Sequence, residues 1–261
     1  MTATRFAFLD HPRPLAFAHR GGALEAEENT LAAFAHAVAL GYSHVETDVQ
    51  ATADGVAVIF HDDDLFRMTG HAAAVAALDW AELAGLRTRG GNPVARLDET
   101  LAAFPETFFN LEAKADGAVT PMIDAIRAAR AVDRVCVGSF VPARVQALRA
   151  ALGPGLCWSP AHAGVLAVWL AGWGLPLAGP GAPALQVPVR FRGIEVVTRR
   201  FVKAAHARGA QVHVWTVDDT DEMSRLLALG VDGLMSDRPT ALRGLLRDRG
   251  LWPGPAASAE G

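Results

Sequence analysis

Short apolar runs alternate with amphipathic segments along most of the chain. The apolar runs are rich in β-branched and aromatic residues, which is typical of buried strands, and the segments between them repeat apolar residues at helical spacing. The predicted strands are 15–18, 43–49 with an extension at 56–60, 107–111, 134–138, 156–158, 184–187, 211–217 and 233–236. The predicted helices are 29–40, 97–104, 118–131, 142–151, part of 161–179, 199–208, 220–229 and 239–249.

Eight strand–helix units in 261 residues favour an α/β fold of the TIM (β/α)8 barrel type over an open doubly wound sheet. No glycine-rich phosphate or dinucleotide loop follows a predicted strand, which weakens the open-sheet alternative. Residues 62–95 break the alternation, and we expect them to form a small insertion after the second β/α unit. The chain, 1–261, is predicted to be a single barrel domain with a frayed tail at 252–261.

The longest apolar stretch spans residues 161–179 and contains Trp169 and Trp173. Glycines and Pro176 interrupt it, and it is shorter than the ~20 apolar residues of a membrane-spanning helix. We expect a buried barrel helix followed by a loop, without stable membrane insertion. A peripheral membrane contact is the alternative.

The composition limits the partners that the chain attracts. Its 24 Lys and Arg against 28 Asp and Glu give a net charge of −4, so the overall field does not attract nucleic acid or anionic lipid. Cys136 and Cys157 lie in apolar runs without metal-ligand spacing, and we expect both to be buried and reduced. With no signal peptide visible in Met1–Leu9, this indicates a cytoplasmic protein. The oligomeric state is left open.

Polar residues gather where the first three predicted strands end. In a barrel these ends share one face, and that face builds the active site. The residues are His19 and Arg20 after the first strand, Glu46 and Asp48 at the second, His61 after its extension, and Glu112 and Lys114 at the third.

The acidic residues in this set suggest a metal site. Glu46 and Asp48 are two positions apart, so their side chains point to the same face of a strand. Together with Glu112 they would repel one another unless a cation neutralised them, and oxygen ligands suit one Mg²⁺ or Ca²⁺ ion. The alternative, in which each carboxylate pairs with Arg or Lys on a solvated rim, is less favoured for three carboxylates beside two histidines.

The other members of the set suit phosphate chemistry. Because an imidazole titrates near neutrality, His19 and His61 can act as base and acid. Arg20 and Lys114 can bind phosphate oxygens, although ion pairing with the same carboxylates is an alternative. Trp215 ends the seventh predicted strand, where it either walls the pocket or packs in the core. This inventory predicts metal-assisted cleavage of a phosphate ester.

The chain resembles the glycerophosphodiester phosphodiesterase family over nearly its whole length. Each motif is short, and the ordered set with its spacing carries the resemblance. The motifs are His19-Arg20-Gly21, Glu28-Asn29-Thr30, Glu46-Thr47-Asp48, Asp54-Gly55, His61-Asp62, Asn110-Leu111-Glu112-Ala113-Lys114, Ser139-Phe140, Trp215-Thr216-Val217, Gly230-Val231-Asp232-Gly233 and Ser236-Asp237-Arg238-Pro239.

The resemblance implies a barrel with a small insertion and assigns roles to single residues. The implied roles are general base and acid for His19 and His61, divalent-metal ligands for Glu46, Asp48 and Glu112, phosphate binding for Arg20 and Lys114, support of the mouth for Glu28, and lining of the glycerol or head-group pocket for Trp215. Two positions depart from the family's usual pattern. Glu27 replaces a proline and adds negative charge near the mouth, and Thr47 replaces Ile or Leu, with its side chain expected to point away from the mouth.

The activity implied is metal-dependent hydrolysis of a glycerophosphodiester, a small molecule, to sn-glycerol 3-phosphate and an alcohol. The nearest alternative is a phospholipase D-type enzyme of the same family that cleaves lysophospholipids, in which Trp169 and Trp173 would serve the acyl chain. A non-catalytic metal-dependent binding barrel is a further alternative, disfavoured because both histidines and all three carboxylates are present.

Overall fold

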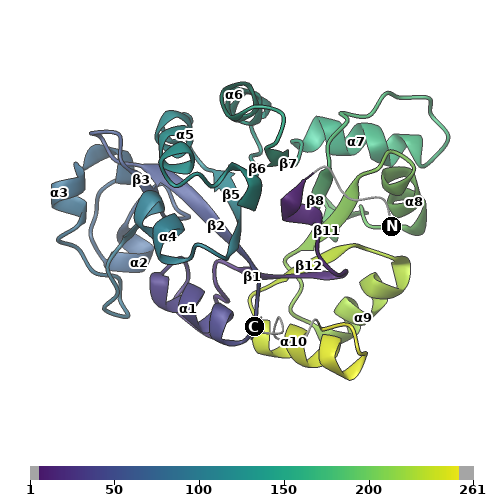
Figure 1. Ribbon diagram of the computed structural model, residues 1–261, viewed down its shortest axis with the longest axis horizontal. Helices are drawn as coiled ribbons and strands as arrows, with labels where there is room; N and C mark the ends of the chain where they lie inside the picture. Colours follow the sequence, from purple (N-terminus) through teal and green to yellow (C-terminus); the bar gives the residue numbers. More distant parts are fainter. Residues whose placement is uncertain (1–5, 253–261) are drawn as a thin grey trace, which may run out of the picture.

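The computed structural model describes residues 6–252, which form a parallel eight-stranded barrel surrounded by helices (Figure 1). The barrel strands are β1 (Leu15–His19), β2 (His44–Ala51), β5 (Phe108–Ala113), β6 (Val135–Gly138), β7 (Cys157–Trp158), β8 (Ala184–Pro188), β11 (Gln211–Trp215) and β12 (Gly233–Ser236). The helices that follow them are α1 (Leu31–Ala39), α4 (Leu97–Ala103), α5 (Val119–Ala128), α6 (Pro142–Leu152), α7 (His162–Ala171), α8 (Arg199–His206), α9 (Thr220–Leu229) and α10 (Pro239–Asp248). The predicted TIM barrel is confirmed.

Strand pairing nearly closes the barrel. Hydrogen-bonded neighbours run from β7 through β6, β5, β2, β1, β12 and β11 to β8. At the seam between the two ends of this path, the backbone N–H of Gln186 on β8 donates to Oγ of Ser159, just after β7, over 3.0 Å. A side-chain hydrogen bond therefore links the two end strands.

Local sequence sets both the helix ends and the direction in which strand side chains point. Thr30 caps α1 by accepting from the backbone N–H of Ala33 at 3.1 Å. On β2, Val45 and Val49 belong to the main hydrophobic core with Phe34 of α1. Alternation along the strand then turns the residues between them, at 46 and 48, into the barrel.

The insertion lies inside the second strand–helix unit, between β2 and α4. Its elements are β3 (Ala57–Ile59), α2 (Phe66–Thr69), a 3₁₀ turn (Val75–Ala77), α3 (Trp80–Leu83) and β4 (Ala95–Arg96). β3 pairs antiparallel with β2, and β4 with β3, over a small core of their own. The sequence predicts an insertion after the second unit; the structure places it before the helix of that unit, because α4 packs on the barrel as the second helix.

The apolar stretch at 161–179 is less buried than predicted. Only Val168 of α7 is fully buried, and Leu166 is 53% exposed. The prediction of a buried helix was wrong because α7 packs against α8 on one side and leaves its other side beside the barrel mouth. A hairpin of β9 (Arg190–Phe191) and β10 (Ile194–Glu195), which the apolar pattern does not predict, borders the same space.

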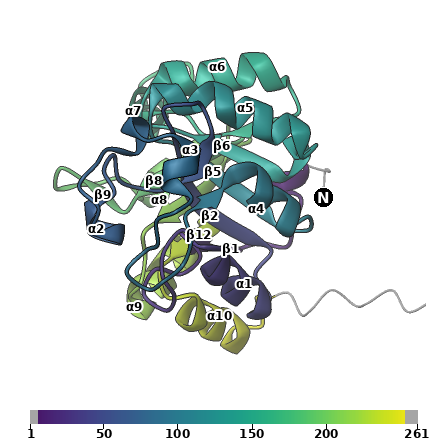
Figure 2. The ribbon, with the colours of Figure 1, turned by 90° about the vertical axis from the view of Figure 1, so that its left-hand side faces the viewer.

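Figures 1 and 2 show where the insertion, α7 and the β9–β10 hairpin lie around the barrel. Figure 1 places α2 and α3 at one end of the long axis and α7 and α8 at the other. Figure 2 shows α2 and β9 on the same side of the molecule, although β9 begins 121 positions after α2 ends (190 − 69). Within residues 6–252, no helix combines the length and apolarity needed to cross a bilayer.

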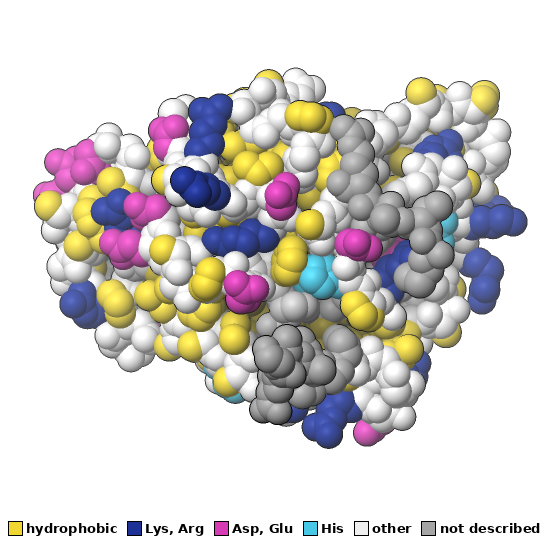
Figure 3. Space-filling model, viewed as in Figure 1, with side chains coloured by type: hydrophobic (Ala, Val, Ile, Leu, Met, Phe, Trp, Pro, Cys, Tyr) yellow, Lys and Arg dark blue, Asp and Glu magenta, His cyan; other side chains and the backbone are white. Residues whose placement is uncertain are grey.

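Other predictions concern burial, charge and the tail. Cys136 and Cys157 are buried and free, as expected. Acidic and basic side chains both occur across the face shown in Figure 3. Trp252 packs against Tyr42 with ring centroids 5.0 Å apart, while the rest of the tail predicted to fray lies outside the described residues. The cytoplasmic location and the single-domain organisation stay predictions.

Candidate active site

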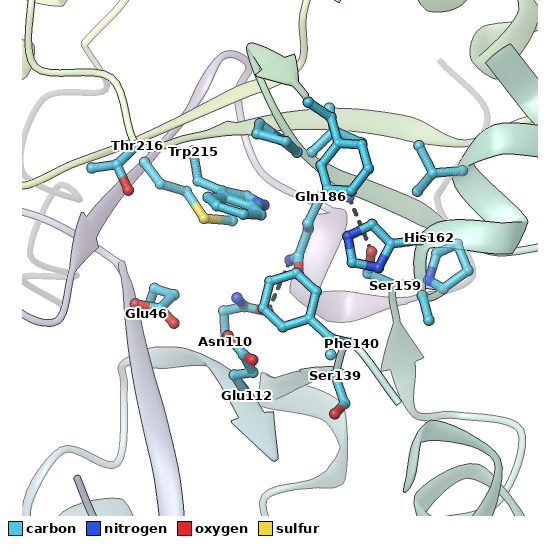
Figure 4. A pocket seen from close by; sticks show the side chains of 18 of the residues that line it. Glu46, Asn110, Glu112, Ser139, Phe140, Ser159, His162, Gln186, Trp215 and Thr216 are labelled. Atoms are coloured by element: carbon cyan, nitrogen blue, oxygen red, sulfur yellow. Dashed lines mark hydrogen bonds between the residues drawn. The ribbon is translucent and has the colours of Figure 1, made fainter. Parts of the chain in front are cut away.

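A cavity of about 380 Å³ opens at the carboxyl ends of the barrel strands. Figure 4 shows the carboxylates of Glu46 and Glu112 on one side of it and the rings of Phe140 and His162 on the other. The predicted site residues that line it are His19, Arg20, Glu46, Asp48, His61, Glu112, Lys114 and Trp215. Glu28 does not line this cavity and instead contacts Arg20 behind its wall.

Three carboxylates converge because β2 and β5 are neighbouring parallel strands. Asp48 is in register with Glu112, and each of Glu46, Asp48 and Glu112 offers an oxygen within 4.8 Å of the others. Glu46 and Asp48 are only 5% and 2% exposed, so they do not form the solvated rim of the alternative interpretation. Their oxygens fit a hard divalent cation.

The pKa values of Glu46 and Glu112 are both raised. Burial raises the pKa of Glu46 to about 8; His19 lowers it, and repulsion from Asp48 and Glu112 adds to the rise. Burial also raises the pKa of Glu112, against the opposing effect of Lys114. A positive charge between the three carboxylates would relieve both perturbations.

Two cations border the carboxylates. Lys114 Nζ lies 3.5 Å from Asp48 Oδ1 and 3.4 Å from Glu112 Oε1. Arg20 Nε lies 3.3 Å from Asp48 Oδ2 without hydrogen-bond alignment, so within residues 6–252 this buried N–H has no hydrogen-bond acceptor. The ion pairs that the alternative interpretation expects are therefore present. Within the described residues, the Nε–H of Arg20 is still free to donate a hydrogen bond.

The turn after β1 orients Arg20. Arg20 itself has a φ of 51°, which is rare for a residue with a side chain, and Gly21 follows with a φ of 84°. A Cβ at Gly21 would lie 2.7 Å from Cβ of Ala33 on α1, so only glycine allows this close approach. The backbone N–H of Arg20 also donates to Glu46 Oε2 at 3.2 Å.

His19 is held at one nitrogen. Its Nδ1 lies 2.7 Å from Asp237 Oδ1, and its Nε2 lies 3.6 Å from Glu46 Oε2. Burial lowers the pKa of His19, but Glu46 and Asp237 outweigh that effect, so the pKa is raised. The partner Asp237 leaves Nε2 directed at the carboxylates and the cavity.

His61 is held in the same way by its neighbour in sequence. Its Nδ1 lies 2.7 Å from Asp62 Oδ1, and Arg67 of α2 donates to both oxygens of Asp62, at 2.6 and 3.0 Å. These Arg67 hydrogen bonds are the main reason that the pKa of Asp62 falls to about 2. Arg67 also donates to Glu28, which accepts from Arg20 at 3.1 Å. One chain of ionic contacts therefore links the insertion to both sides of the site.

The structure adds residues to which sequence reasoning gave no role. Asp237, Asp62 and Asn29 occur in the quoted motifs, so a signal was present; Asn29 Nδ2 donates to Asp48 Oδ2 at 3.0 Å. Thr47 points away from the mouth, as expected, and its hydroxyl donates to Asn29 Oδ1 at 2.7 Å. Arg67 lies in the irregular insertion, where no periodic pattern marked it.

Glu27 does not face the mouth. Its carboxylate accepts from the hydroxyl of Thr88, the backbone N–H of Gly90 at 2.7 Å and Asn92 Nδ2 at 2.6 Å. It therefore fastens the turn at the end of the insertion to the loop after β1. Burial raises the pKa of Glu27, but these hydrogen bonds together outweigh that effect, so the pKa is lowered.

Comparison with known proteins gives one consistent family. The model of the glycerophosphoryl diester phosphodiesterase family matches residues 19–161 and 133–241. A probable glycerophosphodiester phosphodiesterase 2 of Mycobacterium tuberculosis is 38% identical over 256 residues, which cover 95% of this chain and 96% of that protein. Lysophospholipase D GDPD1 of Homo sapiens is 27% identical, over 88% of this chain and 85% of its own.

Comparison with solved structures finds the same kind of protein. A putative glycerophosphoryl diester phosphodiesterase from Silicibacter pomeroyi superposes with a TM-score of 0.79 at 26% identity, and the match covers 95% of this chain and 100% of that one.

Proposed function

The chain belongs to the glycerophosphoryl diester phosphodiesterase family, and we propose that it hydrolyses glycerophosphodiesters to sn-glycerol 3-phosphate and an alcohol, with one divalent ion and two histidines. The observation that carries the proposal is a cavity in which Glu46, Asp48 and Glu112 gather between two imidazoles. A purely binding barrel gives no reason for holding His19 and His61 each by a carboxylate.

Glu46, Asp48 and Glu112 would hold the ion, either Mg²⁺ or Ca²⁺. Their oxygen-only donor set, burial and raised pKa values at two of the three positions support this fit. When bound, such an ion neutralises phosphate charge and lowers the pKa of an attacking hydroxyl.

Arg20 and Lys114 are the phosphate-binding residues in this proposal. The unpaired Nε–H of Arg20, in residues 6–252, and the Nζ of Lys114 both border the carboxylates where the phosphate would lie. Glu28 contributes indirectly, because it contacts Arg20 and Arg67 and so keeps the guanidinium of Arg20 in place. Trp215 lines the cavity beside the glycerol.

His19 acts as the base. A proton on Nδ1, donated to Asp237, leaves the Nε2 lone pair free to take the proton of the glycerol 2-hydroxyl. That oxygen then forms a bond to phosphorus, and the bond between phosphorus and the departing alcohol oxygen breaks.

His61 acts as the acid. Asp62 engages Nδ1, so Nε2 can give its proton to the departing alcohol, and Arg67 fixes Asp62. The cyclic phosphodiester is opened by water, with His61 now accepting a proton and His19 returning one to the 2-oxygen. Both histidines end in their starting states.

The test is a product assay over a panel of glycerophosphodiesters with choline, ethanolamine, serine and glycerol head groups. We expect sn-glycerol 3-phosphate and the free alcohol from at least one substrate. Release of the phosphorylated head group with free glycerol would contradict the proposal, as would absence of turnover across the panel in metal-supplemented protein.

A further inference from the structure

Positive charge is concentrated in one part of the chain. Residues 135–217 contain eight Lys and Arg but a single acidic residue, Glu195, which gives this part a net charge of +7. The other 178 residues contain 16 Lys and Arg and 27 Asp and Glu, a net charge of −11. A local field of this kind can attract an anionic partner that the net charge of the whole chain does not attract.

The fold brings several of these cations to the surface beside α7. Arg190 and Arg192 belong to the β9–β10 hairpin, Arg200 lies in the first turn of α8, and all three are exposed. Within residues 6–252 none of the three forms a salt bridge, so their charges face solvent. Figure 3, in the view of Figure 1, shows Lys and Arg side chains at the end of the molecule where α7 and α8 lie.

Acidic residues begin where this surface meets α9. Arg225 Nη1 lies 3.0 Å from Glu195 Oε1, and its Nε lies 2.7 Å from Glu222 Oε2. The single carboxylate of residues 135–217 is therefore already paired with an arginine of its own, and it leaves the three arginines uncompensated.

Large apolar side chains are exposed among these arginines. Trp173 and Leu175, in the loop after α7, are 56% and 48% exposed, and Ile194 in the hairpin is 57% exposed. The guanidinium of Arg200 lies over the Trp173 ring, 4.5 Å from its centroid. Trp169 links the loop to the hairpin, because its ring lies 5.7 Å from that of Trp173 and its Nε1 donates to the backbone oxygen of residue 195 at 3.3 Å.

We call this continuous region the basic apolar surface. It consists of Trp173, Leu175, Arg190, Arg192, Ile194 and Arg200.

Its two kinds of side chain together identify the partner. A nucleic acid would contact the arginines but leave the apolar side chains in water. A second copy of this chain, docked by two-fold symmetry, would bring arginines against arginines. An anionic bilayer satisfies both kinds, because apolar and tryptophan side chains enter the interfacial region while arginines reach lipid phosphates.

We propose that the basic apolar surface docks the protein reversibly on an anionic phospholipid bilayer. This inference goes beyond the proposed function and does not depend on it, because it concerns where the protein lies and not what it cleaves. Ile194 also lines the cavity, so a docked molecule holds the barrel mouth towards the lipid. The apolar stretch 161–179 alone suggests a peripheral contact, and the arginines add the selection for anionic lipid.

The test is co-sedimentation of the whole protein with vesicles of pure phosphatidylcholine and with vesicles that contain about one third phosphatidylglycerol. Since each Lys or Arg near an anionic membrane strengthens binding about fivefold, we expect at least tenfold tighter binding to the anionic vesicles. About 0.5 M salt should weaken that binding at least tenfold, because ions screen exposed charges. Equal binding to both kinds of vesicle, or binding to neither, would overturn the proposal.

A charge variant locates the contact. The double variant Arg190→Gln, Arg192→Gln should bind anionic vesicles at least tenfold more weakly than the wild type. Its matched control is Arg247→Gln, Arg249→Gln, which removes two exposed arginines with the same spacing at the end of α10 and should bind like the wild type. Equal losses in the two double variants would assign the binding to net charge and contradict a defined docking surface.

Apolar variants test the contact with the bilayer interior. Trp173→Ala and Leu175→Ala should each weaken vesicle binding at least threefold, and Leu251→Ala, at a 38% exposed leucine beyond α10, should not. Brominated acyl chains should quench the fluorescence of the wild type more than that of Trp173→Phe. Unchanged binding in both alanine variants, with equal quenching, would leave only attraction by charge and refute the proposed surface.

Sedimentation velocity without lipid examines the remaining partner. A dimer that Trp173→Ala separates, together with absence of vesicle binding, would assign the surface to a second copy of the chain instead. Since the substituted side chains are all exposed, each variant should unfold at the wild-type temperature, and the comparison of lipid compositions with the wild type needs no variant.

Discussion

At the scale of single residues, the site consists of polar groups each fixed by a second polar group. Asp237 and Asp62 hold the two histidines, and Asn29 holds Asp48. Such contacts set the tautomer of an imidazole and the direction of a carboxylate, which a catalytic arrangement requires before substrate binds.

The acid role of His61 predicts an effect that depends on the leaving group. His61→Ala should lower kcat for a choline ester at least a hundredfold and spare an aryl ester such as glycerophospho-p-nitrophenol to within tenfold. An alcohol needs a proton to depart, whereas nitrophenolate does not, and general acid catalysis contributes roughly 10²–10⁴-fold. Stopped assays of both substrates measure the contrast.

The control for this prediction is His71→Ala, at an exposed histidine in the same insertion, which should leave both rates unchanged. Equal losses on the two esters in His61→Ala would assign His61 a positioning or binding role instead.

The sequence marks the residues with chemistry better than the residues that hold them. Glu46 and Asp48 are recognisable because strand alternation puts them on one face, and β2–β5 pairing adds Glu112. Arg67 is not recognisable, because its contacts to Glu28 and Asp62 depend on how the insertion folds back, which no local period encodes. Long-range side-chain pairing is a tertiary property.

At the scale of elements, prediction is best where a segment is buried on one regular face. α9 and β12 fall on the predicted residues, because Asp219 caps the helix and Gly230 ends it. α7 is mispredicted because it is apolar on all sides, so hydrophobic periodicity could not distinguish the side that lines the cavity from a side buried in the core. The β9–β10 hairpin is too short for an alternating pattern to show.

Different elements supply different residues of the site. The parallel strands β1, β2 and β5 supply the carboxylates, both cations and His19 at or just past their ends, as expected for a barrel. The insertion supplies His61 and its supporting residues, and α7 with the β9–β10 hairpin supplies apolar side chains that line the cavity. The carboxylates, both cations and one histidine therefore come from the barrel, whereas the second histidine comes from the insertion.

At the scale of the whole molecule, two interior histidines link stability to pH. Burial lowers the pKa of His44 to about 3 and that of His213 to about 4. Below pH 6.5 the unfolded chain binds protons at these positions that the folded protein does not, so each contribution to the unfolding free energy falls as the pH drops, by up to about 1.4 kcal/mol per pH unit.

His44→Gln and His213→Gln should therefore show a weaker loss of stability than the wild type between pH 6.5 and 5. Urea unfolding at several pH values measures this, and comparing variant with wild type separates it from Glu46, whose raised pKa acts in the opposite direction. An unchanged pH dependence in both variants would mean that these histidines become protonated in the folded protein.

The central claim is that three carboxylates from two neighbouring strands bind one divalent ion. Calorimetric titration of Mg²⁺ and Ca²⁺ into chelator-treated protein tests it most directly. We predict one ion per chain, binding weakened at least a hundredfold in Glu46→Gln and Glu112→Gln, and unchanged binding in Glu99→Gln, at a 63% exposed side chain outside the cavity. No binding of either ion, or equal binding in all three variants, would contradict the account.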